Sequence, residues 1–197
     1  RVVDRDAWPS LEEYVTTVVA EFRDDTRVIA WDLYNEPGNS GMGSKSDALV
    51  AAAFEWARAA NPTQPMTVGV WTPELPDLNA LALRESDVVS FHNYGDVASM
   101  QAQIDELAQL GRPLLCTEWM RRPISLFASD LPVLKEHGVG GYAWGLVNGK
   151  TQTHFPWGSP EGADEPAVWF HDLLRTDGSS YDAEEVAFVR RTQRGDA

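Results

Sequence analysis

Hydrophobic positions recur along the chain in two alternating patterns. Between residues 8 and 24 the apolar side chains lie three or four positions apart, which predicts an amphipathic helix. Residues 28–34 form a segment that is too short and too apolar to be a surface helix. We therefore expect a strand that is buried on both faces. The rest of the chain repeats this succession of helix and strand.

The repetition predicts further helices and strands in alternation. Helices are expected at 46–60, 77–84, 97–110 and 126–137, and strands at 66–71, 88–91, 113–117 and 141–146. Glycine and proline mark 147–165 as a long irregular loop, which a short helix at 168–174 and a closing helix at 183–191, capped by Asp182, are expected to follow. Strands that alternate with helices in this way form parallel βαβ units.

Parallel βαβ units build either a barrel or a doubly wound open sheet, and two features favour the barrel. No glycine-rich phosphate loop follows the first strand, although a dinucleotide-binding sheet would need one. Polar and aromatic residues also gather where successive strands end, which is where a barrel builds its active site. They are Asn35, Glu36, Trp71, His92, Tyr94, Glu118 and Trp144. The sequence therefore predicts an α/β fold of the (β/α)8 TIM-barrel type, with residues 1–197 in a single domain.

Composition narrows the classes of partner. The chain holds 16 basic and 30 acidic residues, and its formal charge of -14 disfavours binding to nucleic acid or to an anionic membrane. No apolar stretch approaches the roughly 20 residues that a membrane-spanning helix needs. The four histidines show no metal-ligand spacing, and the single cysteine, Cys116, sits in an apolar run. We therefore expect neither a metal nor another cofactor.

Glu36 and Glu118 each end a predicted strand. Two carboxylates at neighbouring strand ends can hydrolyse a glycosidic bond, because one protonates the leaving oxygen while the other attacks the anomeric carbon or activates water. Each glutamate alone also has a purely structural interpretation, as part of a turn before Pro37 or as a strand end in water. Several of the eight tryptophans lie near strand ends too, where they either fill core space or stack on sugar rings.

Four strand ends taken together resemble a known family. Asn35-Glu36-Pro37, His92-Asn93-Tyr94, Glu118 and Trp144 are similar, in order and strand position, to the active-site set of the retaining (β/α)8-barrel glycoside hydrolases of clan A, most closely glycoside hydrolase family 5. The resemblance implies that Glu36 is the general acid/base and Glu118 the nucleophile of a double displacement. It also implies that Tyr94 hydrogen-bonds the nucleophile and helps to keep it ionised.

The resemblance also implies sugar-binding roles. Asn35 would hydrogen-bond the 2-hydroxyl of the sugar being cleaved, His92 would line the pocket, and Trp144 would form the floor beneath the sugar. For His92 the alternative is a core histidine with satisfied hydrogen bonds. Trp71, at the end of its own predicted strand, is a further candidate for stacking. The expected substrate is a β-linked polysaccharide or oligosaccharide of the cellulose, xylan or mannan type.

The resemblance covers only part of a barrel. Residues 28–34 correspond to the fourth strand, so strands four to eight with their helices are expected here, and strands one to three are missing, together with the family's active-site arginine and histidine from them. We therefore expect the chain to be the C-terminal part of a longer enzyme. Its partners would be that N-terminal part, or other copies that associate through exposed strand edges.

Other functions and the compartment stay open at this level. A catalytically silent carbohydrate-binding remnant, or an inactive truncated fragment, would keep the same residues. No signal peptide is recognisable in the chain, which starts at Arg1, and secretion would be a property of the full-length parent.

Overall fold

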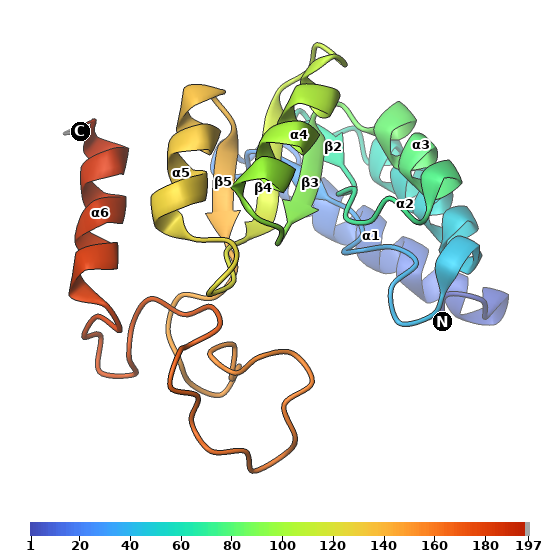
Figure 1. Cartoon of the computed structure of the whole chain (residues 1–197). Helices are drawn as coiled ribbons and strands as arrows, with labels where there is room; N and C mark the ends of the chain where they lie inside the picture. The colour runs from blue at the N-terminus through green and yellow to red at the C-terminus, as the bar shows by residue number, and fades with distance from the viewer. Residues whose placement is uncertain (196–197) are drawn as a thin grey trace. The chain divides into compact units, whose positions relative to one another are not determined.

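In the computed structural model, which describes residues 1–195, the chain forms two compact units (Figure 1). The first unit is Arg1–Phe91, and the second begins at His92. Both contain helices and parallel strands, as the sequence predicts. Among the described residues, no helix is long and apolar enough to cross a membrane.

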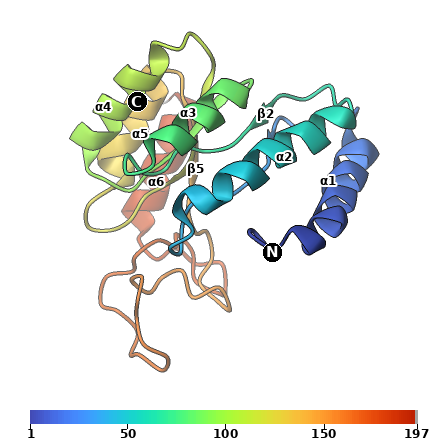
Figure 2. The same ribbon diagram turned by 90° about the vertical axis from the view of Figure 1, so that its right-hand side faces the viewer.

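Three α-helices and a short sheet make up the first unit. Its elements are η1 Arg5–Ala7, α1 Trp8–Phe22, β1 Trp31–Asp32, η2 Gly43–Ser46, α2 Asp47–Ala59, β2 Met66–Thr67 and α3 Pro76–Glu85. Helix α2 packs against both α1 and α3 (Figure 2). Its residues Val50, Ala53, Phe54 and Ala57 are buried and lie three or four positions apart. The helical spacing in the sequence therefore marks the core of this unit.

Strand β1 is shorter and less buried than the sequence predicts. It pairs in parallel with β2 in a two-stranded sheet, with Trp31 opposite Met66. Ile29 is 63% exposed and Asp32 is exposed, so the expectation of a strand buried on both faces is wrong. A strand at the edge of so small a sheet leaves one edge and part of its faces open, which accounts for the difference.

The second unit is built around parallel strands and the helices that cover them. Strand β3 Val89–Asn93 leads into this unit, and the elements that follow are α4 Val97–Ala108, β4 Leu114–Trp119, α5 Phe127–Glu136, β5 Gly140–Ala143 and α6 Ala183–Arg194. The sheet order is β3-β4-β5, and β4 runs parallel to β5 with Leu115 opposite Gly140. Helix α5 packs against both β5 and α6 (Figure 1). The predicted order of strands and helices is thus confirmed through 146.

The predicted cap of the last helix is present. The carboxylate of Asp182 accepts hydrogen bonds from the backbone N–H groups of Glu184 and Glu185, at 2.8 and 3.1 Å. A capping carboxylate satisfies N–H groups that have no partner within the helix and complements the helix dipole. Helix α6 therefore begins where the sequence indicates, at Ala183.

Residues 147–165 form the predicted irregular loop, drawn in orange in Figure 1, but 168–174 do not form the predicted helix. The backbone groups of this segment bond to other segments instead. The N–H of Phe170 donates to the carbonyl of His154, and the carbonyl of Phe170 accepts from the N–H of Arg122, both at 2.8 Å. Backbone groups engaged in this way are not available for the bonds within a helix.

Candidate active site

Glu118 lies one residue before the end of β4, and two other predicted site residues contact it. Its side-chain oxygen Oε2 accepts a hydrogen bond from the hydroxyl of Tyr94 at 2.8 Å. Nδ1 of His92, at the end of β3, lies 3.5 Å from the same oxygen. His92 is buried, and Glu118 is only 9% exposed. The structure therefore brings together the proposed nucleophile, its hydroxyl donor and the histidine that the sequence assigns to the same pocket.

The turn after β3 is held in place by side chains on both sides of Tyr94. The side-chain oxygen of Asn93 accepts from the backbone N–H of Gly95 at 2.8 Å, and its amide donates to Gln103 at 2.7 Å. Arg121, which follows β4, donates from Nε to the carbonyl of Tyr94 at 2.7 Å. These bonds fix the backbone from which the Tyr94 side chain extends toward Glu118.

Cys116 lies two positions before Glu118 on β4 and is fully buried. Burial raises the pKa of its thiol well above the usual range, so the side chain is a protonated, apolar part of the core. The interpretation of this cysteine as an inert core residue fits its environment.

Glu36 lies in the first unit, four residues beyond β1, in a strained turn. Its φ angle is 44°, in the left-handed region that costs a residue with a side chain about 1–3 kcal/mol. The carboxylate is half-buried and accepts from the side-chain amide of Asn39 at 2.6 Å. Asn35, just before it, is exposed. Strain of this kind persists where surrounding contacts hold it in place, and it is often found at functional sites.

Trp71 supports the same turn. Its indole N–H donates to the carbonyl of Pro37 at 2.9 Å, and its side chain is half-buried. A hydrogen bond thus links Trp71 to the Asn35–Pro37 turn within the first unit. Both were predicted from the sequence to be parts of the site.

Trp144 follows β5 directly and borders a hollow in the second unit. Its backbone N–H donates to the carbonyl of Trp119 at 2.9 Å, which continues the pairing of β4 with β5. The hollow, of about 610 Å³, is formed largely by residues 151–163 together with Trp144 and His171. Trp144 is 42% exposed and Trp157, from the long loop, is 56% exposed. The hollow therefore has two accessible indole rings in its lining.

Three residues around Tyr94 were not identified as site residues from the sequence. The ring of Trp157 lies 4.8 Å from that of Tyr94, and the ring of His171 lies 5.7 Å from it. Arg121 holds the backbone of Tyr94, as described above. Arg121 could have been found from its position just beyond the strand that carries Glu118. Trp157, one of the tryptophans considered for stacking on sugar, and His171 are distant from Tyr94 in the sequence, and no local pattern predicts their contact with it.

His171 is a buried histidine of unusual environment. Its Nδ1 lies 2.7 Å from the carbonyl of Met120, which identifies Nδ1 as the protonated nitrogen of the neutral ring. Burial lowers the pKa of His171, and the nearby Arg122 and Arg121 act in the same direction, whereas the hydrogen bond to Met120 and the charge of Asp172 oppose them. Burial therefore favours the neutral form of the ring beside Tyr94.

The fold of the chain is shared with glycoside hydrolases of known structure. An endo-β-1,4-xylanase of glycoside hydrolase family 10 from Gloeophyllum trabeum is 17% identical, with a TM-score of 0.65 over 97% of this chain and 68% of its own. A β-glucuronidase from Ruminococcus gnavus is 17% identical, with a TM-score of 0.63 over 93% of this chain and 36% of its own. An endo-β-1,4-mannanase from Thermotoga petrophila is 15% identical, with a TM-score of 0.63 over 98% of this chain and 51% of its own.

At these identities the likeness concerns the fold alone. The three proteins are TIM-barrel enzymes, so the prediction of an α/β fold that forms part of a (β/α)8 barrel is confirmed. The chain spans between about a third and about two thirds of their lengths. Among curated protein sequences, none matches the chain significantly.

The sequence itself carries a family signature. The model of the cellulase family, glycosyl hydrolase family 5, matches residues 4–125, which is well over half of the chain. The matched stretch includes the turn with Glu36 and the strand ends with His92, Tyr94 and Glu118, and it stops before Trp144. The match covers nearly all of the first unit and the beginning of the second. Because it includes well over half of the residues, the chain belongs to glycosyl hydrolase family 5, the cellulase family.

Proposed function

We propose that the barrel to which this chain belongs is a retaining β-glycosidase that cleaves a β-linked polysaccharide or oligosaccharide of the cellulose, xylan or mannan type. The observation that carries the proposal is the 2.8 Å hydrogen bond from Tyr94 to the mostly buried carboxylate of Glu118. A hydroxyl that donates to a carboxylate orients it and favours its ionised form. An oriented, ionised carboxylate is what a nucleophilic role requires.

In the proposed reaction Glu118 attacks the anomeric carbon while Glu36 gives a proton to the departing glycosidic oxygen. The sugar is then esterified to Glu118. In the second step Glu36 takes a proton from water, the water attacks the anomeric carbon, and Glu118 leaves as a carboxylate. Two inversions retain the configuration, and this mechanism needs the two carboxyl groups about 5 to 5.5 Å apart.

The assignment of Glu36 is supported by its own turn. The strained backbone and the hydrogen bond from Asn39 hold the carboxyl group in one orientation. The resemblance to the family assigns Asn35 to the 2-hydroxyl of the sugar, and the residue is exposed at the same turn. Trp71 is assigned to sugar contact beside this turn, with its indole N–H already bonded to Pro37.

The sugar being cleaved is assigned to the region between Glu118 and the hollow. Trp144 borders the hollow and presents an accessible ring, which suits the apolar C–H face of a pyranose. His92 lies against Glu118 and would line the same pocket. The proposed activity belongs to the complete barrel, in which residues 1–197 supply strands four to eight and an N-terminal part supplies strands one to three.

The test uses the full-length protein and a 4-nitrophenyl β-glycoside. Wild type is expected to release a product that first appears as the β-anomer in NMR spectra. Glu118→Ala is expected to lower kcat by at least about a thousandfold, because no carboxylate is left to attack the anomeric carbon. Azide should restore part of the activity and give the α-glycosyl azide, since a single displacement inverts the configuration.

The Glu36→Ala variant distinguishes the proposed acid/base role of Glu36 from the nucleophilic role of Glu118. It should slow cleavage of poor leaving groups far more than that of 4-nitrophenol, which leaves without protonation, and azide should then give the β-glycosyl azide. Glu106→Ala, on the exposed side of α4, is the matched control and should leave kcat unchanged. Unchanged activity in Glu118→Ala would overturn the proposal, and sugar binding without any hydrolysis would favour a carbohydrate-binding role instead.

A further inference from the structure

The hydroxyl of Tyr94 can donate to Glu118 only while the tyrosine ring keeps one orientation. Tyr94 follows the last residue of β3, so no strand pairing fixes its side chain. Small rotations about the side-chain torsions would carry the hydroxyl away from the 2.8 Å contact with Glu118. Something must therefore pack against the ring itself.

Trp157 makes a close ring contact with Tyr94. Its indole meets the tyrosine ring edge-on, with centroids 4.8 Å apart and planes at 90°. This is one of the preferred geometries for a pair of aromatic rings. His171 contacts Tyr94 at 5.7 Å and Trp157 at 5.5 Å, so the three rings form a closed group. The tyrosine ring is thus held by a side chain of the long loop.

Trp157 is held in turn by residues outside its loop. Phe170 meets its ring edge-on at 5.0 Å, and the guanidinium of Arg121 lies over the ring at 5.6 Å. The same Arg121 donates to the backbone carbonyl of Tyr94 at 2.7 Å. One arginine therefore secures both the backbone of Tyr94 and the ring that packs against its side chain.

Trp157 is nevertheless 56% exposed, which is unusual for a large aromatic side chain with so many ring contacts. A residue needed mainly for the core would be buried. Its ring contacts Tyr94, and the residue is also one of those that line the hollow.

We infer that Trp157 is a positioning residue for the nucleophile. Its ring fixes Tyr94 so that the hydroxyl of Tyr94 keeps donating to Glu118, and the loop of residues 147–165 thereby contributes to the reaction without touching the reacting atoms. This inference rests on the proposed function, in which Glu118 is the nucleophile. It assigns to Trp157 a role distinct from that of Trp144, which is proposed to contact the sugar.

The test compares Trp157→Ala and Trp157→Phe in the full-length protein, each with intact Tyr94 and in the Tyr94→Phe background. A short 4-nitrophenyl β-glycoside serves as substrate. Tyr94→Phe should lower kcat about tenfold to a hundredfold, the range for a hydrogen bond to a charged group. Trp157→Ala should lower kcat about tenfold and leave KM within about twofold, because the ring acts through Tyr94. Trp157→Phe should restore most of the loss.

The decisive result is the double variant. If Trp157 acts only by placing the Tyr94 hydroxyl, Trp157→Ala should cost little more once that hydroxyl is gone. A loss of the same size in both backgrounds, or a loss that appears in KM alone, would overturn the inference and identify Trp157 as a sugar contact or a general structural residue.

A crystal structure of Trp157→Ala gives a readout that does not depend on activity. The inference predicts that the Tyr94 hydroxyl moves beyond hydrogen-bond distance of Glu118, and an unchanged 2.8 Å contact would overturn it. The two proposals fail in different ways. If Glu118→Ala is inactive and rescued by azide while Trp157→Ala keeps full kcat, only the role of Trp157 is lost. Activity that survives Glu118→Ala would remove the basis of both.

Discussion

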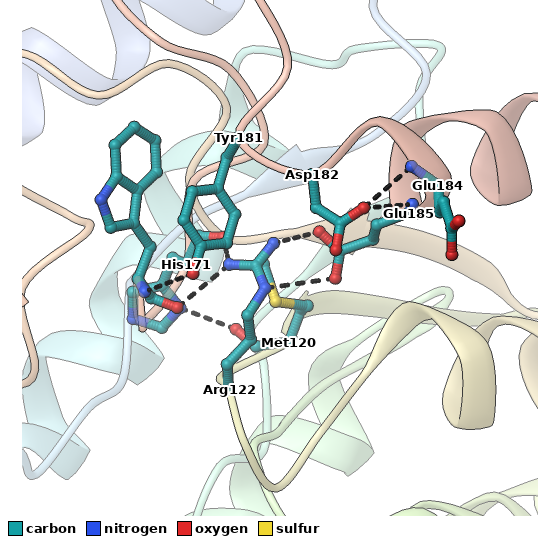
Figure 3. Close-up of polar contacts among 8 residues, drawn as sticks. Met120, Arg122, His171, Tyr181, Asp182, Glu184 and Glu185 are labelled. Carbon is teal, nitrogen blue, oxygen red and sulfur yellow. Dashed lines mark hydrogen bonds and ion pairs between the residues drawn. The ribbon is translucent and has the colours of Figure 1, made fainter. Parts of the chain in front are cut away.

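The guanidinium of Arg122 lies between the carboxylate of Glu185 and two backbone carbonyls, those of Trp169 and His171 (Figure 3). Nε donates to Glu185 at 3.2 Å, Nη2 forms a second contact with the same carboxylate, and Nη1 donates to both carbonyls. The Arg122 side chain is 7% exposed and that of Glu185 16%. The side chain of Arg122 thus links the segment after β4 with α6 and with the segment that contains His171.

This arrangement predicts that Glu185→Ala lowers the free energy of unfolding by about 3 kcal/mol, because it leaves a buried guanidinium without its counter-charge. Urea denaturation of the purified protein measures the loss. Glu85→Ala is the matched control, since Glu85 pairs with a largely exposed Arg84 and such pairs contribute less than about 1 kcal/mol. Similar losses of unfolding free energy in the two variants would show that the buried Arg122–Glu185 pair stabilises the fold no more than the exposed pair does.

Gly145, directly after Trp144, predicts a second stability effect. Its φ is +83°, and a Cβ at this position would lie 2.7 Å from a carboxylate oxygen of Asp172 and 2.8 Å from Cβ of His171. Gly145→Ala therefore combines backbone strain with a clash against a fully buried carboxylate. We expect a loss of about 2–4 kcal/mol in the free energy of unfolding, measured by thermal or urea denaturation.

A comparison with Gly158 in the long loop distinguishes the cost of backbone strain from the cost of the clash. The φ of Gly158 is +80°, nearly that of Gly145, but a Cβ there would meet no atom within 4 Å. Gly158→Ala should therefore cost only the backbone strain, about 1 kcal/mol. If the two alanine variants lose the same stability, the close approach of Gly145 to Asp172 has no energetic consequence.

The parts of the fold that the sequence predicts well are those encoded by local periodicity. The apolar spacing of α2 and the capping carboxylate of Asp182 involve neighbours within a few positions, and both are found where expected. The contact of Tyr94 with Glu118 was expected from the resemblance to glycoside hydrolase family 5, which also implied that His92 lines the same pocket.

The failures have a common physical cause, which is that distant segments decide the outcome. Residues 168–174 contain enough apolar residues to suggest a helix, yet Phe170 bonds through its backbone to His154 and Arg122. Ile29 reads as a core residue, but β1 has too little sheet around it to bury that side chain. Trp157 contacts Tyr94 although the two residues are 63 positions apart in the sequence, and no local pattern predicts such a contact.

His171 predicts a pH dependence of stability. Burial lowers the pKa of its ring in the folded protein below the ordinary value of 6.5, which applies to the unfolded chain. Between these two pKa values the unfolded state binds more protons than the folded state, so the free energy of unfolding rises with pH in that range. The contribution of the His171 ring to the free energy of unfolding is therefore fully present above about pH 6.5. It is lost as the pH falls toward the pKa of the ring in the folded protein.

The measurement is the free energy of unfolding of wild type and His171→Phe at intervals between pH 5 and pH 8. Wild type should lose up to about 1.4 kcal/mol per pH unit more than the variant below pH 6.5, because phenylalanine has no proton to bind. His171→Phe should be less stable at pH 8, since the hydrogen bond to the carbonyl of Met120 is gone, and the two curves should converge on acidification. Parallel curves for wild type and His171→Phe would show that folding does not change the proton affinity of this ring.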